Sequence, residues 1–256
     1  CEPDRFYADG SEKDTRDLVM ESVSVIKVGG KIAEDVAVLN AFLHDLGSVT
    51  GPKVLVHGGG VIATKIGEKL GISSQMIEGR RVTDKETLEV ATMVYGGLIN
   101  KRIVAKLQSM GVNAIGLTGA DLNIIEADKR PPEPIDFGWV GDIKKVNTDW
   151  LVSLIEKDVL PVMAPLTHDG NGNMLNTNAD SIASFTAGAL ANRLNTRLVL
   201  CFDMPGVMEN GKVIPEIDLK RYSELKASGV VKDGMIPKLD LGFQALNAGV
   251  SEVIIK

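Results

Sequence analysis

The chain has 256 residues, 44% of them hydrophobic, so it is long enough to bury a large core in one domain or in two lobes. Its 28 basic and 34 acidic residues give a net charge of −6, which argues against a broad nucleic-acid-binding surface but not against a lysine cluster that binds a small anion. No apolar run approaches the ~20 residues that cross a bilayer, and no secretory signal is evident. We therefore expect a soluble, cytoplasmic protein with no nucleic-acid or membrane partner.

Residues 1–20 differ in composition from the rest of the chain. They are polar, repeat Asp and Glu, and show no sustained periodicity. We interpret this stretch as a flexible leader or an expression remnant, with an oligomerisation arm as the functional alternative.

Two apolar strands are each expected to end in a glycine loop that leads into a helix. The strands are residues 24–28, which carry Lys27, and residues 53–57; helical patterns follow at 31–46 and 61–70. The loops contain Gly29 and Gly30 after the first strand, and Gly58, Gly59 and Gly60 after the second. The N–H groups of a glycine backbone and of a helix N-terminus favour a bound phosphate. Because the two strands and the helix between them form a βαβ unit, both loops should lie at one edge of a parallel sheet. A buried strand with an ordinary turn is the alternative for either loop alone.

A long helix is expected from residue 83 to beyond residue 107. Thr83 and Glu86 have the spacing of a capping box, and Leu88, Ala91 and Tyr95 fall on one face. This helix could pack against its twin in a dimer or lie buried within its own lobe, and the sequence favours neither.

Short strands and turns alternate through the middle of the chain. We expect a core strand at 113–117, antiparallel ribbons within 122–147 that could cover a site, a helix at 149–157 and a buried strand at 159–164. The composition changes near Pro165, where we place a boundary between a lobe formed by residues 21–165 and a lobe formed by residues 166–256.

Near the start of the second lobe, residues 169–172 have the composition of a turn. Asn176, Asn178 and Asp180 follow at alternate positions. Asn178 or Asp180 could cap the following helix, whereas on extended backbone all three side chains would point to one side. Cys201 lies in an apolar run and is expected to be a buried thiol. The remaining expected elements are a strand at 198–202, a hairpin at 210–211, helices at 218–228 and 235–248, and a strand at 252–255.

Several well-known sites are missing from the sequence. The P-loop motif, the Gly-x-Gly-x-x-Gly dinucleotide motif and the Gly-x-Ser-x-Gly motif of esterases do not occur. The three histidines, His44, His57 and His168, show no paired spacing, so we assign no metal ligand.

Five short motifs in order resemble the N-acetylglutamate kinases of the amino-acid kinase superfamily between residues 23 and 255. They are Lys27-x-Gly29-Gly30, His57-Gly58-Gly59-Gly60, Gly79-x-Arg81-Val82-Thr83, Asn176-x-Asn178-x-Asp180 and Asp233-Gly234-Met235-x-x-Lys238. The resemblance implies an α/β three-layer sandwich with a mostly parallel sheet in two lobes, and we expect the chain to form a homodimer. It also implies phosphoryl transfer from MgATP to the side-chain carboxylate of an N-acyl-L-glutamate, N-acetylglutamate above all, in arginine or ornithine biosynthesis.

The resemblance also implies a role for each matching residue. Lys27 and Lys238 would stabilise the transferring phosphoryl group, and Asp180 would hold both lysines. Backbone groups of Gly29, Gly30 and Gly59 would donate to that phosphoryl group. The acyl amino acid would be bound by Gly59, Gly60, Arg81, Asn176 and Asn178. The nucleotide would be bound by Asp203, Gly206, Val207, Lys232, Asp233 and Gly234. Mg²⁺ would be held mainly by ATP oxygens and water.

Other functions stay open at this point. Arg80 stands where the family commonly has an apolar residue, so it could meet a second carboxylate and favour N-succinylglutamate, or it could be a solvated surface arginine. A related kinase acting on carbamate, aspartate or a nucleoside monophosphate is a further alternative. A non-catalytic nucleotide sensor would not need Lys27, Asp180 and Lys238 together.

Overall fold

The computed structural model describes residues 22–29, 31–77, 80–202, 204–232 and 234–256. Its centre is a six-stranded sheet in which every neighbouring pair is parallel, in the order β14-β11-β1-β2-β8-β5. The strands are β1 (Val23–Val28), β2 (Lys53–His57), β5 (Ala114–Leu117), β8 (Leu160–Met163), β11 (Thr196–Cys201) and β14 (Glu252–Ile255). The α/β fold with a parallel sheet is as expected from the sequence.

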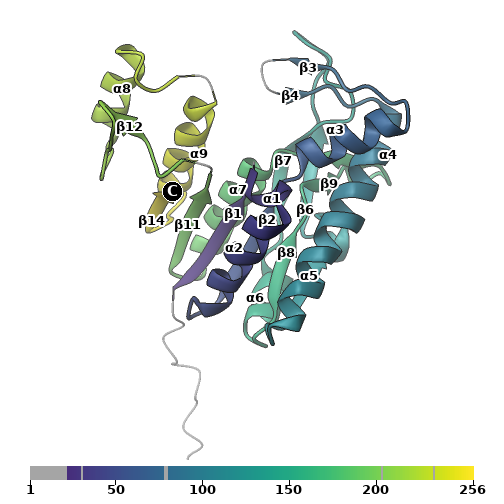
Figure 1. Cartoon of the computed structure of the whole chain (residues 1–256), viewed down its shortest axis with the longest axis horizontal. Helices are drawn as coiled ribbons and strands as arrows, with labels where there is room; N and C mark the ends of the chain where they lie inside the picture. The colour runs from purple at the N-terminus through teal and green to yellow at the C-terminus, as the bar shows by residue number, and fades with distance from the viewer. Residues whose placement is uncertain (1–21, 30, 78–79, 203, 233) are drawn as a thin grey trace, which may run out of the picture.

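Helices cover both faces of this sheet (Figure 1), which is why β1 is buried along its whole length. One core cluster joins Ile26 and Val28 of β1 to α2 (Val36–Ser48) and α5 (Asn100–Ser109). A second cluster joins Val23 and Val25 to the opposite layer. That layer contains α6 (Asp149–Ile155), α7 (Ala179–Ala191) and α9 (Met235–Asn247). Because side chains alternate along a strand, Lys27 shares the face of Val25, towards α7.

A second sheet lies beside the first and has the order β10-β9-β6-β7. Its strands are β6 (Ile125–Lys129), β7 (Gly141–Val146), β9 (Leu166–His168) and β10 (Met174–Asn176). The β6–β7 pair confirms the expected antiparallel ribbon. A separate hairpin, β3 (Met76–Ile77) and β4 (Arg80–Arg81), stands at one end of the molecule (Figure 1).

The last part of the chain has its own small core. It contains the hairpin of β12 (Met208–Glu209) and β13 (Lys212–Val213), whose turn residues Asn210 and Gly211 have positive φ, and α8 (Leu219–Ala227). Tyr222 and Leu225 pack there with Leu239 of α9. In Figure 1 α8 and β12 lie at the opposite end of the molecule from β3 and β4.

Three local expectations need correction. The helix expected at 31–46 is two helices, α1 (Lys31–Glu34) and α2, because the Asp35 side chain accepts hydrogen bonds at the start of α2. The long helix is capped by Asp84 and not by Thr83, since the Asp84 carboxylate accepts from the Thr87 N–H at 2.8 Å. That helix is also not α-helical throughout: a π-helical segment, η2 (Thr92–Ile99), joins α4 (Lys85–Ala91) to α5.

The remaining helices are α3 (Gly60–Lys69) and the short 3₁₀ turn η3 (Asp121–Asn123). Within the described residues, no helix is both long and apolar enough to cross a membrane. The sequence interpretation of residues 1–20 lies outside the described residues.

Candidate functional site

The two glycine loops touch at the carboxyl ends of β1 and β2. The Gly58 N–H donates to the Val28 carbonyl at 2.9 Å. A Cβ on Gly58 would lie only 3.5 Å from the Gly29 Cα. The expectation that both loops share one edge of the sheet is confirmed, and this edge is where open α/β sheets bind ligands.

Lys27 and Asp180 meet beneath these loops. Lys27 is the last side chain of β1 on the sheet face that α7 covers. Asp180 lies in the first turn of α7. The lysine Nζ is 2.8 Å from a carboxylate oxygen, and the two side chains are 8% and 13% exposed. A Cβ on Gly29 would lie 2.3 Å from the same Nζ, so the glycine leaves room for the amine above the main chain.

Lys238 approaches the same place from α9. The Ser184 hydroxyl of α7 donates to the Leu241 carbonyl of α9 at 2.8 Å, which holds the two helices side by side. Asp180 lies one turn before Ser184, and Lys238 lies one turn before Leu241, both towards the carboxyl edge of the sheet. The structure thus brings together three residues that are far apart in the sequence.

Both ammonium groups face the ring of Phe202. The Nζ of Lys238 is 3.9 Å from the ring centroid, and the Nζ of Lys27 is 5.3 Å from it. Phe202 directly follows β11, and its N–H donates to the Lys256 carbonyl at 2.7 Å, so its backbone is fixed at the sheet edge. Two distant lysines therefore converge on one small region.

Arg81 lies on the other side of the glycine loops. Its Nη2 donates to the Gly60 carbonyl at 2.8 Å and to the Thr64 hydroxyl at 2.7 Å. Burial raises the pKa of the Tyr95 hydroxyl. The positive charge of Arg81 and the hydrogen bond between Arg81 and Tyr95 offset part of that rise. Gly59 packs under these groups, since a Cβ there would lie 2.3 Å from the Ile99 side chain and 3.1 Å from the Tyr95 ring.

Asn176 connects to Arg81 through Thr83. The Asn176 side-chain amide donates to the Thr83 hydroxyl at 3.0 Å, and that hydroxyl donates to the Arg81 carbonyl at 3.3 Å. These contacts explain why Thr83 does not cap the long helix. They fix the β4 hairpin against β10.

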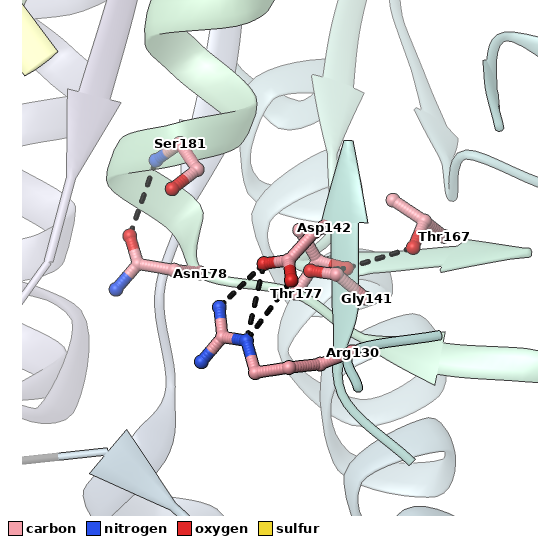
Figure 2. A network of polar contacts seen from close by, with 7 residues as sticks. All are labelled: Arg130, Gly141, Asp142, Thr167, Thr177, Asn178 and Ser181. Carbon is pink, nitrogen blue, oxygen red and sulfur yellow. Dashed lines mark hydrogen bonds and ion pairs between the residues drawn. The ribbon is translucent and has the colours of Figure 1, made fainter. Parts of the chain in front are cut away.

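Asn178 caps α7: its side-chain oxygen accepts from the N–H groups of Asp180 at 2.8 Å and Ser181 at 3.1 Å. Of the two alternatives that the sequence left open, the cap by Asn178 is confirmed, and the single extended run is not formed because β10 ends at Asn176 and Asp180 is helical. Figure 2 shows Asn178 with Ser181 at this cap, and the Arg130 guanidinium paired with Asp142 of β7.

The expected nucleotide residues lie around the small C-terminal core. Gly206 has a φ of 143°, which only glycine adopts without strain, and Val207 is buried with its carbonyl accepting from Ile214. Gly234 is the residue before α9, and Lys232 is exposed. The expected contacts of Gly30, Asp203 and Asp233 lie outside the described residues.

Two buried groups near the site are not arranged for reaction. The His57 Nδ1 donates to the Gly58 carbonyl at 2.9 Å, and its Nε2 accepts from the Asn100 side-chain amide at 3.2 Å. Burial lowers the pKa of this imidazole to about 4. Burial likewise raises the pKa of the Cys201 thiol, against a smaller lowering by Lys256 and Lys27. The thiol is buried as expected, and both groups are neutral near pH 7.

The arrangement suits an anionic substrate. Two ammonium groups, one guanidinium and a pair of bare backbone loops stand at one sheet edge, and the Asp180 carboxylate pairs with Lys27 there. Across the described residues, no three His, Cys, Asp or Glu side chains gather as ligands for a metal ion. The sequence analysis missed Phe202 and Thr64, which carry no motif, although Thr64 stands one helical turn after Gly60. It named Tyr95 as part of a helix face but did not place it beside Arg81.

Comparisons with known proteins agree with this geometry. The sequence model of the amino acid kinase family matches residues 22–256. The acetylglutamate kinase of Bacteroides thetaiotaomicron is 57% identical over 239 residues, which are 92% of this chain and 93% of that protein. The acetylglutamate kinase of Methanopyrus kandleri is 41% identical over 91% of this chain and 94% of its own length. The crystal structure of smu.665 from Streptococcus mutans is 30% identical, with a TM-score of 0.79 over 91% of this chain and 94% of that one.

Proposed function

Because the chain belongs to the amino acid kinase family, we propose that it transfers the γ-phosphoryl group of ATP to the side-chain carboxylate of N-acetyl-L-glutamate, in arginine or ornithine biosynthesis. Relatives named acetylglutamate kinase that align over more than nine-tenths of both chains support this substrate. The observation that carries the proposal is the convergence of Lys27, Asp180 and Lys238 beside the glycine loops.

The reaction needs charge neutralisation more than a protein nucleophile. A substrate carboxylate attacks a γ-phosphate that is also anionic, so like charges must be brought together. Lys27 and Lys238 stabilise the transferring group, while Asp180 holds the lysine ammonium in place without entering the reaction. Backbone N–H groups of Gly29, Gly30 and Gly59 donate to the same group.

The acyl amino acid is held by the Arg81 side of the site. The Arg81 guanidinium binds the α-carboxylate of the substrate, because its planar fork matches a carboxylate. Its bonds to the Gly60 carbonyl and the Thr64 hydroxyl fix the direction of that fork. Gly59, Asn176 and the amide of Asn178 complete the acyl-glutamate pocket.

ATP is held by residues that flank the small C-terminal core. We assign nucleotide binding to Asp203, Gly206, Val207 and the residues from Lys232 to Gly234, which precede Lys238 of α9 in the chain. Mg²⁺ accompanies ATP and offsets phosphate charge, bound mainly by nucleotide oxygens and water, as is common for this ion. Of the two lobes, residues 21–165 supply most of the acyl-glutamate side, and residues 166–256 supply the nucleotide side together with Asn176 and Asn178 of the acyl-glutamate pocket.

We also propose that the enzyme is a cytoplasmic homodimer that pairs through the outer face of α4 and η2. Met93 on that face is 56% exposed. It lines a hollow with Leu88, Trp139 and Met174, and apolar surface of this kind favours association. Sedimentation velocity of the wild type and of Met93→Glu tests this, and a wild-type monomer at micromolar concentration would contradict it.

The decisive experiment is an ADP-release assay with hydroxylamine to trap the acyl phosphate. The substrate panel contains N-acetylglutamate, N-succinylglutamate, aspartate, carbamate and a nucleoside monophosphate. We expect the highest kcat/KM with N-acetylglutamate and a hydroxamate product. Turnover of carbamate or of the nucleotide in its place would assign another kinase of this family, and binding of ATP without any turnover would assign a sensor.

A further inference from the structure

We propose that Phe202 is a positioning residue whose aromatic face holds the ammonium groups of Lys27 and Lys238 on one side of the phosphoryl-transfer site. The inference rests on the proposed function, since the two lysines matter only if a phosphoryl group passes between them. Their Nζ atoms lie 5.3 Å and 3.9 Å from the ring centroid, within the ~6 Å at which an ammonium is attracted to the negative face of an aromatic ring.

The ring offsets part of the repulsion between the two ammonium groups, each of which stands on a flexible stem. It acts beside the ion pair in which the Lys27 Nζ lies 2.8 Å from an Asp180 oxygen. An aromatic face offsets like charges without introducing an anion that would repel the incoming phosphate. A leucine of similar size would fill the space but would not attract either cation.

The position of the Phe202 ring is fixed by the backbone of the central sheet. β11 pairs with β1 along its length, with Leu200 opposite Lys27 and Cys201 opposite Val28. Phe202 follows directly and is anchored through its N–H to the Lys256 carbonyl at 2.7 Å. The sheet therefore sets the position of the ring, and the ring contributes to the position of the two amines.

Fluorination of the ring separates attraction from shape. Phenylalanine analogues carrying one, two or three ring fluorines at position 202 keep nearly the same size while the negative face weakens. We expect kcat to fall stepwise by roughly three- to tenfold across the series, while the KM values for ATP and acyl-glutamate change less than about twofold. The same series at Phe243, which stacks on Tyr222 with ring centroids 5.3 Å apart, is the matched control and should leave kcat unchanged.

A second measurement does not depend on activity. In Phe202→Tyr the ring current should keep the ε-methylene protons of Lys238 shifted upfield in NMR spectra, and in Phe202→Leu the shift should disappear. Unshifted Lys238 protons in the wild type, a flat fluorine series, or a rising kcat would each overturn the proposed role of the ring. An inactive wild type with the expected lysine shifts would defeat the kinase assignment instead, so the two failures can be told apart.

Discussion

The Nζ of Lys27 lies 2.8 Å from a carboxylate oxygen of Asp180, and both side chains are almost fully shielded from water. Lys27 is the last residue of β1 whose side chain points towards α7, and Asp180 lies in the first turn of α7. A buried ion pair costs desolvation, so its presence at the edge of the sheet favours a functional reason over a stabilising one.

Removing the carboxylate should leave the Lys27 charge buried without its partner. We expect Asp180→Asn to lower the free energy of unfolding by about 3 kcal/mol, measured by urea denaturation, and to reduce kcat strongly. Asp149→Asn is the matched control, because Asp149 is 78% exposed in its pair with Arg193 and its loss should cost less than about 1 kcal/mol. Equal losses for the two variants would contradict this interpretation of the buried pair.

Lys238 should act on the transition state more than on substrate binding. We expect Lys238→Ala to reduce kcat roughly 100-fold or more, as for other removed transition-state donors, with a much smaller rise in the KM for acyl-glutamate. Lys226→Ala is the control, since that exposed lysine also lies over an aromatic ring, Tyr222, but in the C-terminal core. Near-normal turnover of Lys238→Ala would rule out the assigned role.

Arg81 should show the opposite pattern. Arg81→Lys removes the planar fork, and we expect the KM for acyl-glutamate to rise by about tenfold or more while the KM for ATP stays within about twofold. Thr64→Val removes the hydroxyl that accepts from Arg81 at 2.7 Å and should raise the same KM by a few-fold. If either variant raised the KM for ATP instead, Arg81 would belong to the nucleotide side.

The sequence predicted the parallel sheet and the glycine loops well because both follow from local patterns. β-branched runs that end in glycine are buried strands, and consecutive βα units place their loops at one edge. The hairpin at Asn210 and Gly211 is equally local, since both residues accept positive φ. The same local signals located Lys27, and the resemblance supplied its distant partners.

The sequence could not predict contacts that depend on tertiary structure. Thr83 has the spacing of a cap, but the Asn176 amide occupies its hydroxyl, and Asp84 caps the helix instead. Asn178 stands in a row of polar residues, yet its side-chain oxygen is used by the first turn of α7. Phe202 has no pattern of its own, because its role arises from two lysines that only the fold brings together.

Stability should depend on pH through His57. Its pKa is 6.5 in the unfolded chain and falls to about 4 in the folded one because of burial. The neutral His57 ring therefore costs no stability above pH 6.5. As the pH falls from 6.5 towards 4, the unfolded chain binds a proton that the folded chain does not, so the free energy of unfolding declines by about 3 kcal/mol.

The measurement is urea denaturation between pH 7 and 4 for the wild type, His57→Gln and the control His44→Gln, whose imidazole is 77% exposed. Between pH 6.5 and 4, the free energy of unfolding should decline less in His57→Gln than in the wild type and His44→Gln. An NMR titration that finds the His57 ring charging near pH 6.5 in the folded wild type would refute the prediction.

Arg80 should not select the acyl group. It is exposed on β4, opposite Ile77 and one residue before Arg81, and neighbouring residues of a strand point to opposite sides. Since Arg81 reaches Gly60 and Thr64, the Arg80 side chain is directed away from the acyl-glutamate pocket. We therefore expect Arg80→Leu to leave the ratio of kcat/KM for N-acetylglutamate and N-succinylglutamate unchanged within about twofold, far below the effect of a carboxylate–arginine contact. A preference for the succinyl substrate that the wild type shows and Arg80→Leu loses would instead mean that the hairpin turns this arginine towards the bound substrate.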